Sequence, residues 1–576
     1  MKKTGAELVL FALEQIGVQY TFGIPGVHNT ELYDALNSSD QITPILVTHE
    51  GGAAFMADAV SRTTDHIGTL IVVPAAGVTH AMSGIGEAFL DGIPMLVIVG
   101  GVRRDTGKSY QLHQVDHHKL VSGIVKQVFL AQHHRDIIKV IYDAYEVATS
   151  GTPGPVFVEI PSNLLLFQDS VDDIPTYNPP THKRPLDFVK IKQAAILLKQ
   201  AKNPGLYLGW GAVHCVEQSI QLAEKLHMPV STTLQGLSSF PDSHPLHTGM
   251  GFGPSATPAA QNAFANCDCL LAAGVRFSEL ATGSYGLPVP KNLIHIDINS
   301  EVFDRNYKTH TSIQGDSKDI FNELIKELEN QVISNDNLQT KEQIALDKAS
   351  YQKEWASFPE KNRVSPYLFF QALEKKLSKS AYIAVDDGNH TFLTMELFPI
   401  EQARHFISPS DFNCMGYCIP AAIATKLCHP EDQVIGIVGD AAFLMTCMEI
   451  ITASIHQLGV IFFVFHDGEL GQISQFQSIP LNRKTCTILG DIQIEGIAQG
   501  TGAAFVEMNT NSDIDSALDK ALQISTTGQP VIVDVNIDYT KKSRFTMGVV
   551  KTNLGRFPLG EKVRFVGRAI KRHIFG

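Results

Sequence analysis

Two aspartates in the last third of the chain have the residue type and spacing of a metal site. Asp440 follows the apolar run 434–438, and Asp467 follows the next apolar run, 460–465. One strand–helix–strand crossover fits between them, so both carboxylates can meet at the carboxyl edge of one parallel sheet. Two hard oxygen ligands suit Mg²⁺, which usually keeps phosphate oxygens and water as further ligands. Taken alone, either aspartate is also explained as a helix cap.

The residues around Asp440 suit a phosphate ligand as well as a metal. Gly439, Ala441 and Ala442 have little or no side chain. Backbone N–H groups at the start of the following helix can therefore approach a diphosphate closely, and the helix N-terminus favours its negative charge. The run of residues 466–471 after the second strand would form the other wall of the same site.

Alternating strands and helices position these residues. Short β-branched runs, each followed by Gly or Pro and a segment of helical period, recur along the chain, which is typical of parallel sheets buried on both faces. A chain of 576 residues is also too long for one hydrophobic core. We therefore expect an α/β protein with three consecutive doubly wound parallel-sheet domains, at residues 1–166, 187–345 and 366–540, with a proline-rich linker at 167–186 and a basic tail at 541–576.

Composition narrows the class of protein. The net charge of −13 argues against general nucleic-acid binding. The longest apolar runs are far shorter than the roughly 18–20 residues that cross a bilayer, and the first residues lack a signal-peptide core. The eight cysteines show no paired CxxC spacing, which indicates reduced, buried thiols. These features predict a cytoplasmic protein.

The basic tail has an unusual charge. Residues 541–576 contain ten Lys or Arg and one acidic residue, a net charge of +9, whereas the rest of the chain carries −22. Three interpretations compete: an arm that packs on the acidic body and covers the active site, which we favour, a basic helix on a membrane surface, and disorder. Gly555, Pro558, Gly560 and Gly567 are expected to interrupt any long helix.

The segment around Asp440 and Asp467 resembles the thiamine diphosphate (ThDP) motif, in which Gly-Asp-Gly is followed after about two dozen residues by Asn-Asn. The run Gly439-Asp440-Ala441-Ala442-Phe443-Leu444-Met445, together with Glu449, is similar to the acetolactate synthase version. Two departures are visible. Ala441 replaces the usual third-position Gly, and His466-Asp467 replaces Asn-Asn, which keeps an oxygen ligand at the second position.

The resemblance extends over nearly the whole chain. Four further segments match the family in the right order: Phe22–Gly26, Thr48–Ala53, Val385–His390 and Asn413–Ala422. In the middle domain, Gly274–Phe277 and His295–Asn299 are similar to acetolactate synthases. The resemblance implies a ThDP- and Mg²⁺-dependent enzyme.

The resemblance also implies a role for each site residue. Glu50 would hydrogen-bond the aminopyrimidine and promote removal of the C2 proton, Met415 would hold the cofactor bent, and Asn413 would bind the pyrimidine edge. Mg²⁺ would be held by Asp440, Asp467 and the main-chain carbonyl of Glu469. The implied cofactor-binding set is Pro25, Gly26, Glu50, Gly388, Asn389, His390, Asn413, Met415, Gly439, Asp440, Ala441, Ala442, Asp467, Glu469, Leu470 and Gly471.

The resemblance has two implications beyond this site. The first and third domains of such enzymes meet across a subunit interface, which implies a homodimer or homotetramer. The middle domain resembles one that carries FAD in biosynthetic acetolactate synthases, with Gly274, Arg276, Asp297, Asp316 and Gly251–Gly253 at matching places. Because several relatives keep this domain without a flavin, FAD stays open, and we favour a domain without it.

The substrate pocket departs from acetolactate synthases. His28 is at a position that is small in those enzymes and His in benzaldehyde lyase, and Phe476 replaces a Trp. His113 replaces a Gln, for which Gln114 or Gln111 could substitute. His28 and His113 could relay protons, whereas His117 and His118 are interpreted as surface residues.

Three activities remain open. The first is an acetolactate-synthase-type reaction on a 2-oxoacid such as pyruvate. The second is a C–C lyase, decarboxylase or diketone hydrolase of the benzaldehyde lyase type. The third is a catalytically silent regulatory homologue, against which the intact Glu50 and the paired aspartates argue.

Overall fold

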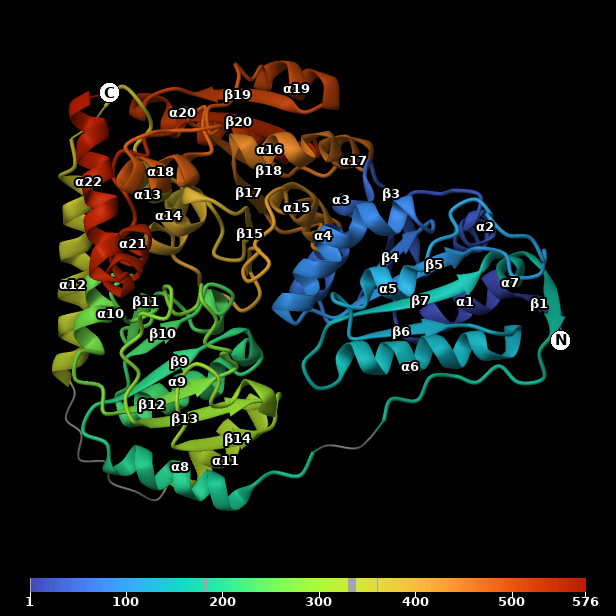
Figure 1. The fold of residues 1–576 in the computed structure, drawn as a ribbon, viewed down its shortest axis with the longest axis horizontal. Coiled ribbons are helices and arrows are strands. Elements are labelled where there is room, and N and C mark those ends of the chain that lie inside the picture. Colours follow the sequence, from blue (N-terminus) through green and yellow to red (C-terminus); the bar gives the residue numbers. More distant parts are fainter. Residues whose placement is uncertain (1, 181–183, 330–337, 360, 576) are drawn as a thin grey trace.

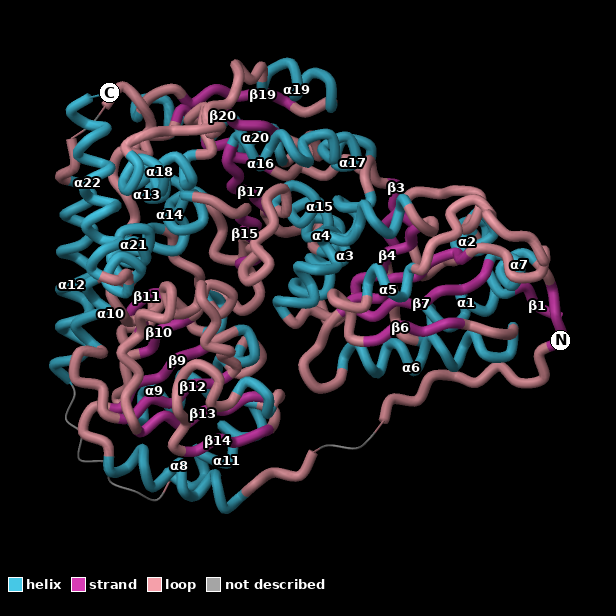
Figure 2. Tube along the Cα trace, in the orientation of Figure 1, coloured by secondary structure: helices cyan, strands magenta, loops and turns pink. Residues whose placement is uncertain are grey.

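The computed structural model describes residues 2–180, 184–329, 338–359 and 361–575. Within these ranges the chain forms three units, each built on a six-stranded parallel sheet (Figures 1 and 2). Figure 1 shows the first unit at the right, the middle unit at the lower left and the third unit at the upper left. The predicted fold class, three consecutive doubly wound parallel-sheet domains, is confirmed.

The first unit has the strand order β3-β2-β4-β5-β7-β6. Its central strands are buried along their whole length, as their uninterrupted apolar runs predict. A short antiparallel pair, β1 (Lys2–Thr4) and β8 (Gln168–Ser170), fixes the start of the chain beside the end of this unit. The strands are β2 (Tyr20–Gly23), β3 (Thr43–Leu46), β4 (Gly68–Val72), β5 (Met95–Gly101), β6 (Gln127–Leu130) and β7 (Pro155–Pro161), and the helices are α1 (Gly5–Gln15), α2 (Thr30–Asn37), α3 (Glu50–Thr63), α4 (Ala76–Asp91), α5 (His117–Val121), α6 (Ile137–Thr149) and α7 (Ser162–Leu166).

The middle unit has the strand order β11-β10-β9-β12-β13-β14. Its last helix runs through residue 345 and along the left edge of the molecule in Figure 1, so it connects the middle unit to the third. The strands are β9 (Pro204–Leu208), β10 (Val230–Thr232), β11 (His247–Met250), β12 (Cys269–Ala273), β13 (Asn292–Asp297) and β14 (Thr311–Gln314), and the helices are α8 (Phe188–Gln200), α9 (Val216–Leu226), α10 (Pro258–Ala263), α11 (Ser317–Leu328) and α12 (Leu338–Ala356).

The third unit has the strand order β16-β15-β17-β18-β20-β19. Strands β17 and β18 are neighbours, so the residues that follow them meet at one edge of the sheet. The strands are β15 (Tyr382–Val385), β16 (Phe406–Ile407), β17 (Val434–Gly439), β18 (Ile461–His466), β19 (Ala504–Met508) and β20 (Val531–Asn536), and the helices are α13 (Pro366–Lys376), α14 (Asn389–Leu397), α15 (Cys418–Cys428), α16 (Asp440–Thr446), α17 (Ile450–Ile455), α18 (Gly471–Leu481), α19 (Ile494–Thr501), α20 (Ile514–Ser525), α21 (Arg544–Arg556) and α22 (Leu559–Phe575).

The first and third units share one hydrophobic core. Helix α3 of the first unit packs along α15 of the third, and Phe55 meets Tyr417 edge to face at a ring distance of 5.5 Å. A buried ion-pair network of the first unit, in which Arg62 bridges Asp58 and Asp91 at 2.6 and 2.8 Å, joins the same contact, because the Tyr417 hydroxyl of the third unit donates to Asp58 at 2.7 Å. The start of α3, where Glu50 lies, is therefore fixed against the third unit of the same chain.

The basic tail is helical, against the expectation that its glycines prevent a long helix. Pro558 does separate α21 from α22, but α22 continues through Gly560 and Gly567. A helical glycine costs only about 1 kcal/mol relative to alanine, so packing overrides it. Helix α22 packs on α18 of the third unit.

Candidate active site

A cleft of about 170 Å³ opens at the carboxyl edge of the third sheet. Three strands contribute to it, because β15, β17 and β18 end side by side and each leads directly into a loop or helix that lines the cleft. Thirteen of the predicted cofactor residues line this cleft: Gly388, Asn389, His390, Asn413, Met415, Gly439, Asp440, Ala441, Ala442, Asp467, Glu469, Leu470 and Gly471.

Three backbone N–H groups hold the carboxylate of Asp440 in the cleft. One of its oxygens accepts a hydrogen bond from the backbone N–H of Ala441 at 2.7 Å. The other accepts from the N–H groups of Asp467 and Gly468, at 3.2 and 2.7 Å. Burial raises the pKa of Asp440, while these hydrogen bonds lower it. The two strand ends are thus joined through this side chain.

Asp467 lies in the same cleft, where the positive charge of Arg363 only partly offsets the carboxylates around it. Burial and the neighbouring Asp440 carboxylate raise the pKa of Asp467 to about 7. The carboxylate of Glu469 instead pairs with Lys484, at 2.6 and 2.5 Å from its two oxygens. The carboxylates of Asp440 and Asp467 repel each other, and a divalent cation bound between them would remove that repulsion.

Helix α14, which follows β15, brings two polar side chains into the cleft. The side-chain amide nitrogen of Asn389 and Nε2 of His390 are buried and have no hydrogen-bond partner among the described residues. Burial lowers the pKa of His390 to about 3, so its ring is neutral at pH 7. Gly388 has φ of +152°, and a Cβ there would lie 2.6 Å from the His390 ring, so only glycine fits. The Asn389 amide is a donor, and the neutral His390 ring donates at Nε2 when its single proton is on that nitrogen, so both suit anionic phosphate oxygens.

The loop between β16 and α15 is fixed from both sides of Met415. The N–H of Cys414 donates to Glu87 at 3.0 Å, and the N–H of Gly416 donates to Asp386 at 2.9 Å. Burial raises the pKa of Glu87 well above its usual value. Sequence reasoning missed Glu87, because it lies 327 residues from Cys414 along the chain and carries no motif.

Glu50 lies outside this cleft, at the first position of α3, with 8% of its surface exposed. Its Oε2 is 3.0 Å from Nδ1 of His80, whose ring stacks on His49 at 4.8 Å. His80 was not singled out from the sequence. The cleft and Glu50 are therefore separate parts of one chain, and Pro25 and Gly26 lie with Glu50 in the first unit.

Glu449 ties the start of α3 to the third unit. Its carboxylate accepts from the N–H of Thr48 at 3.2 Å and from the Thr48 hydroxyl at 2.7 Å. A Cβ at Gly52 would lie 2.7 Å from this carboxylate, so the glycine permits the approach. Burial raises the pKa of Glu449. The motif resemblance includes Glu449 but carries no indication of this contact across 401 residues.

The predicted substrate residues fall into two groups. His28 and His113 stack at a ring distance of 5.1 Å, and within the part of the chain that the structure describes both Nδ1 atoms are buried without a hydrogen-bond partner. Burial and the neighbouring imidazoles lower the pKa of His28. Gln114 instead lies exposed and accepts from the N–H of Gln111. Phe476 is half-buried on α18, far along the chain from this pair, and the single chain does not bring it into the cofactor cleft.

The interpretation of His117 as a surface residue is wrong. Its side chain is 2% exposed, and Nε2 accepts from the N–H of Ala75 at 2.8 Å. Its Nδ1 is 3.6 Å from the buried carboxylate of Glu159 on β7, which also lies 3.4 Å from the half-exposed His118. The apolar pattern of α5 is too short to reveal which side faces the sheet.

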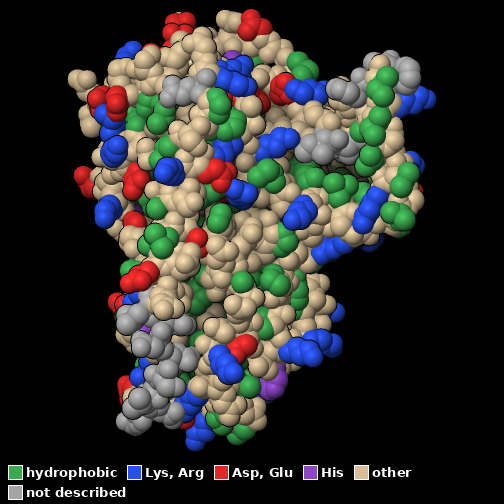
Figure 3. All heavy atoms as spheres, turned by 90° about the vertical axis from the view of Figure 1, so that its left-hand side faces the viewer, with side chains coloured by type: hydrophobic (Ala, Val, Ile, Leu, Met, Phe, Trp, Pro, Cys, Tyr) green, Lys and Arg blue, Asp and Glu red, His purple; other side chains and the backbone are tan. Residues whose placement is uncertain are grey.

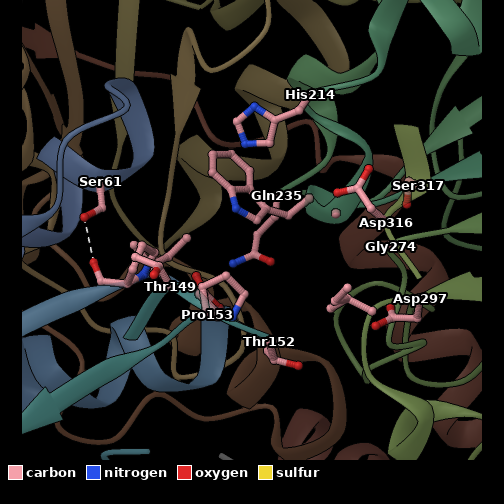
Figure 4. Close-up of a pocket in the computed structure, with 18 of the residues that line it drawn as sticks. Ser61, Thr149, Thr152, Pro153, His214, Gln235, Gly274, Asp297, Asp316 and Ser317 are labelled. Atoms are coloured by element: carbon pink, nitrogen blue, oxygen red, sulfur yellow. Dashed lines mark hydrogen bonds between the residues drawn. The ribbon is translucent and has the colours of Figure 1, made fainter. Parts of the chain in front are cut away.

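A second cavity of about 460 Å³ lies between the first and middle units (Figure 4). Figure 4 shows Thr149, Thr152 and Pro153 on one side and His214, Asp297 and Asp316 on the other. Of the residues predicted to face a flavin, Gly274, Arg276, Asp297 and Asp316 line it, whereas Gly251–Gly253 do not.

Comparison with known proteins decides the family. Three family models match in chain order: the N-terminal TPP binding domain of thiamine pyrophosphate enzymes at residues 3–120, their central domain at 191–324 and their C-terminal TPP binding domain at 386–535. The chain belongs to the thiamine pyrophosphate enzyme family. The resemblance to ThDP enzymes is thereby confirmed.

Within the thiamine pyrophosphate enzymes, this one is acetolactate synthase-like. It is 31% identical to the acetolactate synthase large subunit of Haemophilus influenzae, over 93% of this chain and 95% of that protein. It is 29% identical to the isozyme 1 large subunit of Escherichia coli, over 94% and 95%. It is 30% identical to a probable acetolactate synthase large subunit of Methanocaldococcus jannaschii, over 93% and 92%.

The cleft of this thiamine pyrophosphate enzyme fits ThDP, whereas the second cavity fits a flavin dinucleotide poorly. Both arginines that line the second cavity are already paired, Arg276 with Asp411 at 2.8 Å and Arg404 with Asp65 at 2.6 Å. Asp316 occupies the N-terminus of α11 by accepting from the N–H groups of residues 318 and 319. The diphosphate of FAD would thus meet the carboxylates of Asp297 and Asp316, although the side-chain amide of Gln235, whose nitrogen is unpartnered in the described part of the chain, also lines the cavity.

Proposed function

We propose that the chain is a ThDP- and Mg²⁺-dependent enzyme of the acetolactate synthase type, which decarboxylates a 2-oxoacid such as pyruvate and joins the remaining unit to a second carbonyl compound. The single observation that carries this proposal is that one cleft contains both the unpartnered side-chain nitrogen atoms of Asn389 and His390 and the carboxylates of Asp440 and Asp467. The first pair suits phosphate oxygens, and the second suits a divalent cation. Similarity to acetolactate synthase large subunits supports the substrate class.

Each residue of the cleft has a proposed task. Asp440, Asp467 and the main-chain carbonyl of Glu469 would hold Mg²⁺, and Asn389 and His390 would donate hydrogen bonds to the diphosphate. Bound ThDP supplies a nucleophilic carbon that adds to the carbonyl of the substrate. Glu50 would hold and move a proton at the aminopyrimidine, and Met415, fixed through its neighbours by Glu87 and Asp386, would hold the cofactor bent.

The working site would form between two copies of the chain. Glu50 and the cofactor cleft belong to different units, and the cleft is lined by residues of the third unit. A copy that supplies Glu50 would complete the cleft of its partner, so we propose a homodimer or homotetramer. A concentration series in analytical ultracentrifugation, with activity measured in parallel, tests this, because a fully active monomer contradicts it.

A second candidate function is cleavage or hydrolysis of a hydroxyketone or diketone. The stacked pair of His28 and His113, with unpartnered Nδ1 atoms, favours it, because two imidazoles can exchange protons with a substrate near neutral pH. Products formed from pyruvate and from a benzoin-type ketone distinguish the two functions. Acetolactate from pyruvate supports the first, and aldehyde release from the ketone alone supports the second. Absence of any turnover and of C2 proton exchange would indicate a silent regulatory homologue.

We expect His28→Ala to change product choice more than cofactor activation. Exchange of the C2 proton of bound ThDP should stay near the wild-type rate, whereas decarboxylation, ligation or cleavage should change by on the order of 10²-fold, the usual contribution of a general acid or base. Proton exchange by NMR and product analysis measure both. His456→Ala, which removes an exposed histidine after α17, is the control. Unchanged kinetics on every accepted substrate would assign His28 a structural role.

We expect the purified protein to be colourless or only weakly yellow. The acidic lining of the second cavity and its two paired arginines disfavour a dinucleotide. An absorbance scan before and after denaturation checks this. A stoichiometric band near ~450 nm that is released on denaturation, the usual signature of a bound flavin, would show that the cavity binds FAD.

A further inference from the structure

Helix α22 carries an unpartnered apolar face, which we call the apolar stripe. It consists of Leu559, Val563, Val566, Ile570 and Ile574, whose exposed fractions are 77, 65, 59, 53 and 64%. These residues recur every third or fourth position, which on an α-helix places them on one side. Five large apolar side chains exposed in one row are unusual, because single exposed apolar residues are common but contiguous patches mark interaction sites.

The other side of α22 is held on the protein. Arg572 donates to the carbonyl of Leu481, at the end of α18, at a distance of 2.8 Å. The ring of Phe565 lies 5.5 Å from that of Phe557 and is covered by the guanidinium groups of Arg564 and Arg568. These contacts fix the orientation of the helix, so the apolar stripe faces outward as a consequence of packing. The prediction that the tail packs on the body of the protein is thus confirmed for α22, which packs on α18. That contact does not account for the apolar residues on the outer side of α22.

Basic residues accompany the apolar stripe. The tail from residue 541 carries a net charge of +9 on an otherwise acidic chain. Helix α22 contains Lys562, Arg564, Arg568, Lys571 and Arg572 and a single acidic residue, Glu561. Arg572 is bound to the protein and Arg564 pairs with Glu561 at 2.5 Å. Helical spacing therefore leaves Lys562 and Lys571 as the basic residues nearest the apolar stripe. Figure 3 views the molecule from the side on which α22 lies and shows hydrophobic side chains interspersed with Lys and Arg there.

We propose that α22 binds the surface of an anionic lipid bilayer, with the apolar stripe inserted among the acyl chains and the flanking Lys562 and Lys571 at the headgroups. A helix with one apolar face, a basic remainder and low mean hydropathy lies in the plane of such an interface. Each Lys or Arg near an anionic leaflet adds electrostatic attraction, which salt weakens. No helix in the described ranges is long and apolar enough to span a bilayer, so the contact would be peripheral.

The alternative occupant, a second copy of the chain, fits the apolar stripe less well. Stable protein interfaces use roughly 20–30 residues on each side, whereas the stripe offers five side chains along one edge of the molecule. The chain end lies at the outer corner of the third unit in Figure 1, and the five side chains of the apolar stripe are all exposed. A lipid surface needs no matching contour, so a narrow stripe is sufficient.

Vesicle sedimentation with the full-length protein tests this proposal. We expect binding to phosphatidylcholine vesicles that contain phosphatidylglycerol, loss of binding to phosphatidylcholine alone, and release at high salt. The double variant Val563→Glu/Ile570→Glu should weaken binding by about tenfold or more, because two apolar side chains no longer enter the bilayer. The matched control is Val189→Glu/Ile196→Glu, since these residues of α8 have the same types, the same spacing and similar exposure, 68 and 51%.

The outcomes separate lipid from protein as the occupant. Gel filtration and circular dichroism establish that both double variants fold. Failure of the intact protein to bind anionic vesicles at low salt overturns the proposal. So does a change of oligomeric mass in Val563→Glu/Ile570→Glu without a change in vesicle binding, which would assign the apolar stripe to contacts between copies. Because cofactor turnover is not the readout, these results are independent of the proposed enzymatic reaction.

Discussion

Glu50→Gln is expected to keep ThDP bound but to lower turnover by on the order of 10²–10⁴-fold, the usual cost of losing a positioned general acid–base group. The amide has nearly the shape of the carboxylate but cannot take up a proton at neutral pH. Glu50 is 8% exposed, so water cannot readily replace it. Proton–deuterium exchange at C2 of the bound cofactor, followed by NMR after acid quench, measures the step directly.

Glu31→Gln is the matched control, because Glu31 lies in the first turn of α2 in the same unit, as Glu50 does in α3. Loss of a carboxylate at a helix N-terminus costs only about 0.3–1 kcal/mol of stability and should leave exchange unchanged. If Glu50→Gln exchanges the C2 proton at the wild-type rate, the proposed proton transfer does not involve Glu50. If Glu50→Gln fails to bind ThDP, Glu50 contributes to the affinity for the cofactor, and the loss of turnover then reports binding rather than proton transfer.

The fold and one half of the site follow from local sequence. The apolar runs before Asp440 and Asp467 predict two neighbouring parallel strands, and β17 and β18 are paired directly. Parallel strands deliver the residues that follow them to one edge, which is why spacing alone placed both aspartates together. The small residues around Asp440 then predict close backbone approach to a ligand. None of these steps requires knowledge of contacts between units.

The remainder depends on contacts between distant segments. Glu449 reaches Thr48 across 401 residues, and Glu87 reaches Cys414 across 327, and neither carboxylate has a local pattern that distinguishes it from a surface residue. His117 was misjudged for the same reason, since Glu159 and Ala75, which surround it, come from other elements. The helix α22 was missed because propensity penalises its two glycines, whereas its contacts with α18 come from tertiary packing.

Asp440→Ala is expected to abolish measurable Mg²⁺–ThDP binding. Changes in groups that only support a metal ligand typically cost about 10–100-fold in affinity, and removal of a charged ligand should exceed that range. The N–H groups of Ala441 and Gly468 would also lose their acceptor, at about 1–3 kcal/mol for each buried group left unpaired. Isothermal titration with ThDP in the presence of Mg²⁺ measures the loss.

Asp440→Asn separates the two effects of that substitution. The amide oxygen can still accept a backbone N–H, so the fold of the cleft should survive, whereas the charge is gone. Weak ThDP binding in both variants would assign the loss to the metal. Weak binding in Asp440→Ala alone would assign it to the hydrogen bonds that join the two strand ends. Affinity equal to wild type in both variants would remove the metal from this cleft.

Asp467→Asn should behave in the opposite way and retain Mg²⁺–ThDP, because asparagine keeps an oxygen ligand while the repulsion with Asp440 disappears. In the metal-free protein, the pKa of Asp467 is raised to about 7 by burial and by Asp440. The folded state therefore binds more protons than the unfolded state between pH ~4 and ~7, so stability falls as pH rises through that window. Thermal unfolding of metal-free Asp467→Asn should lose this component of the pH dependence. An unchanged pH profile, together with lost cofactor binding, would mean that the second negative charge is required to hold the metal rather than tolerated beside the first.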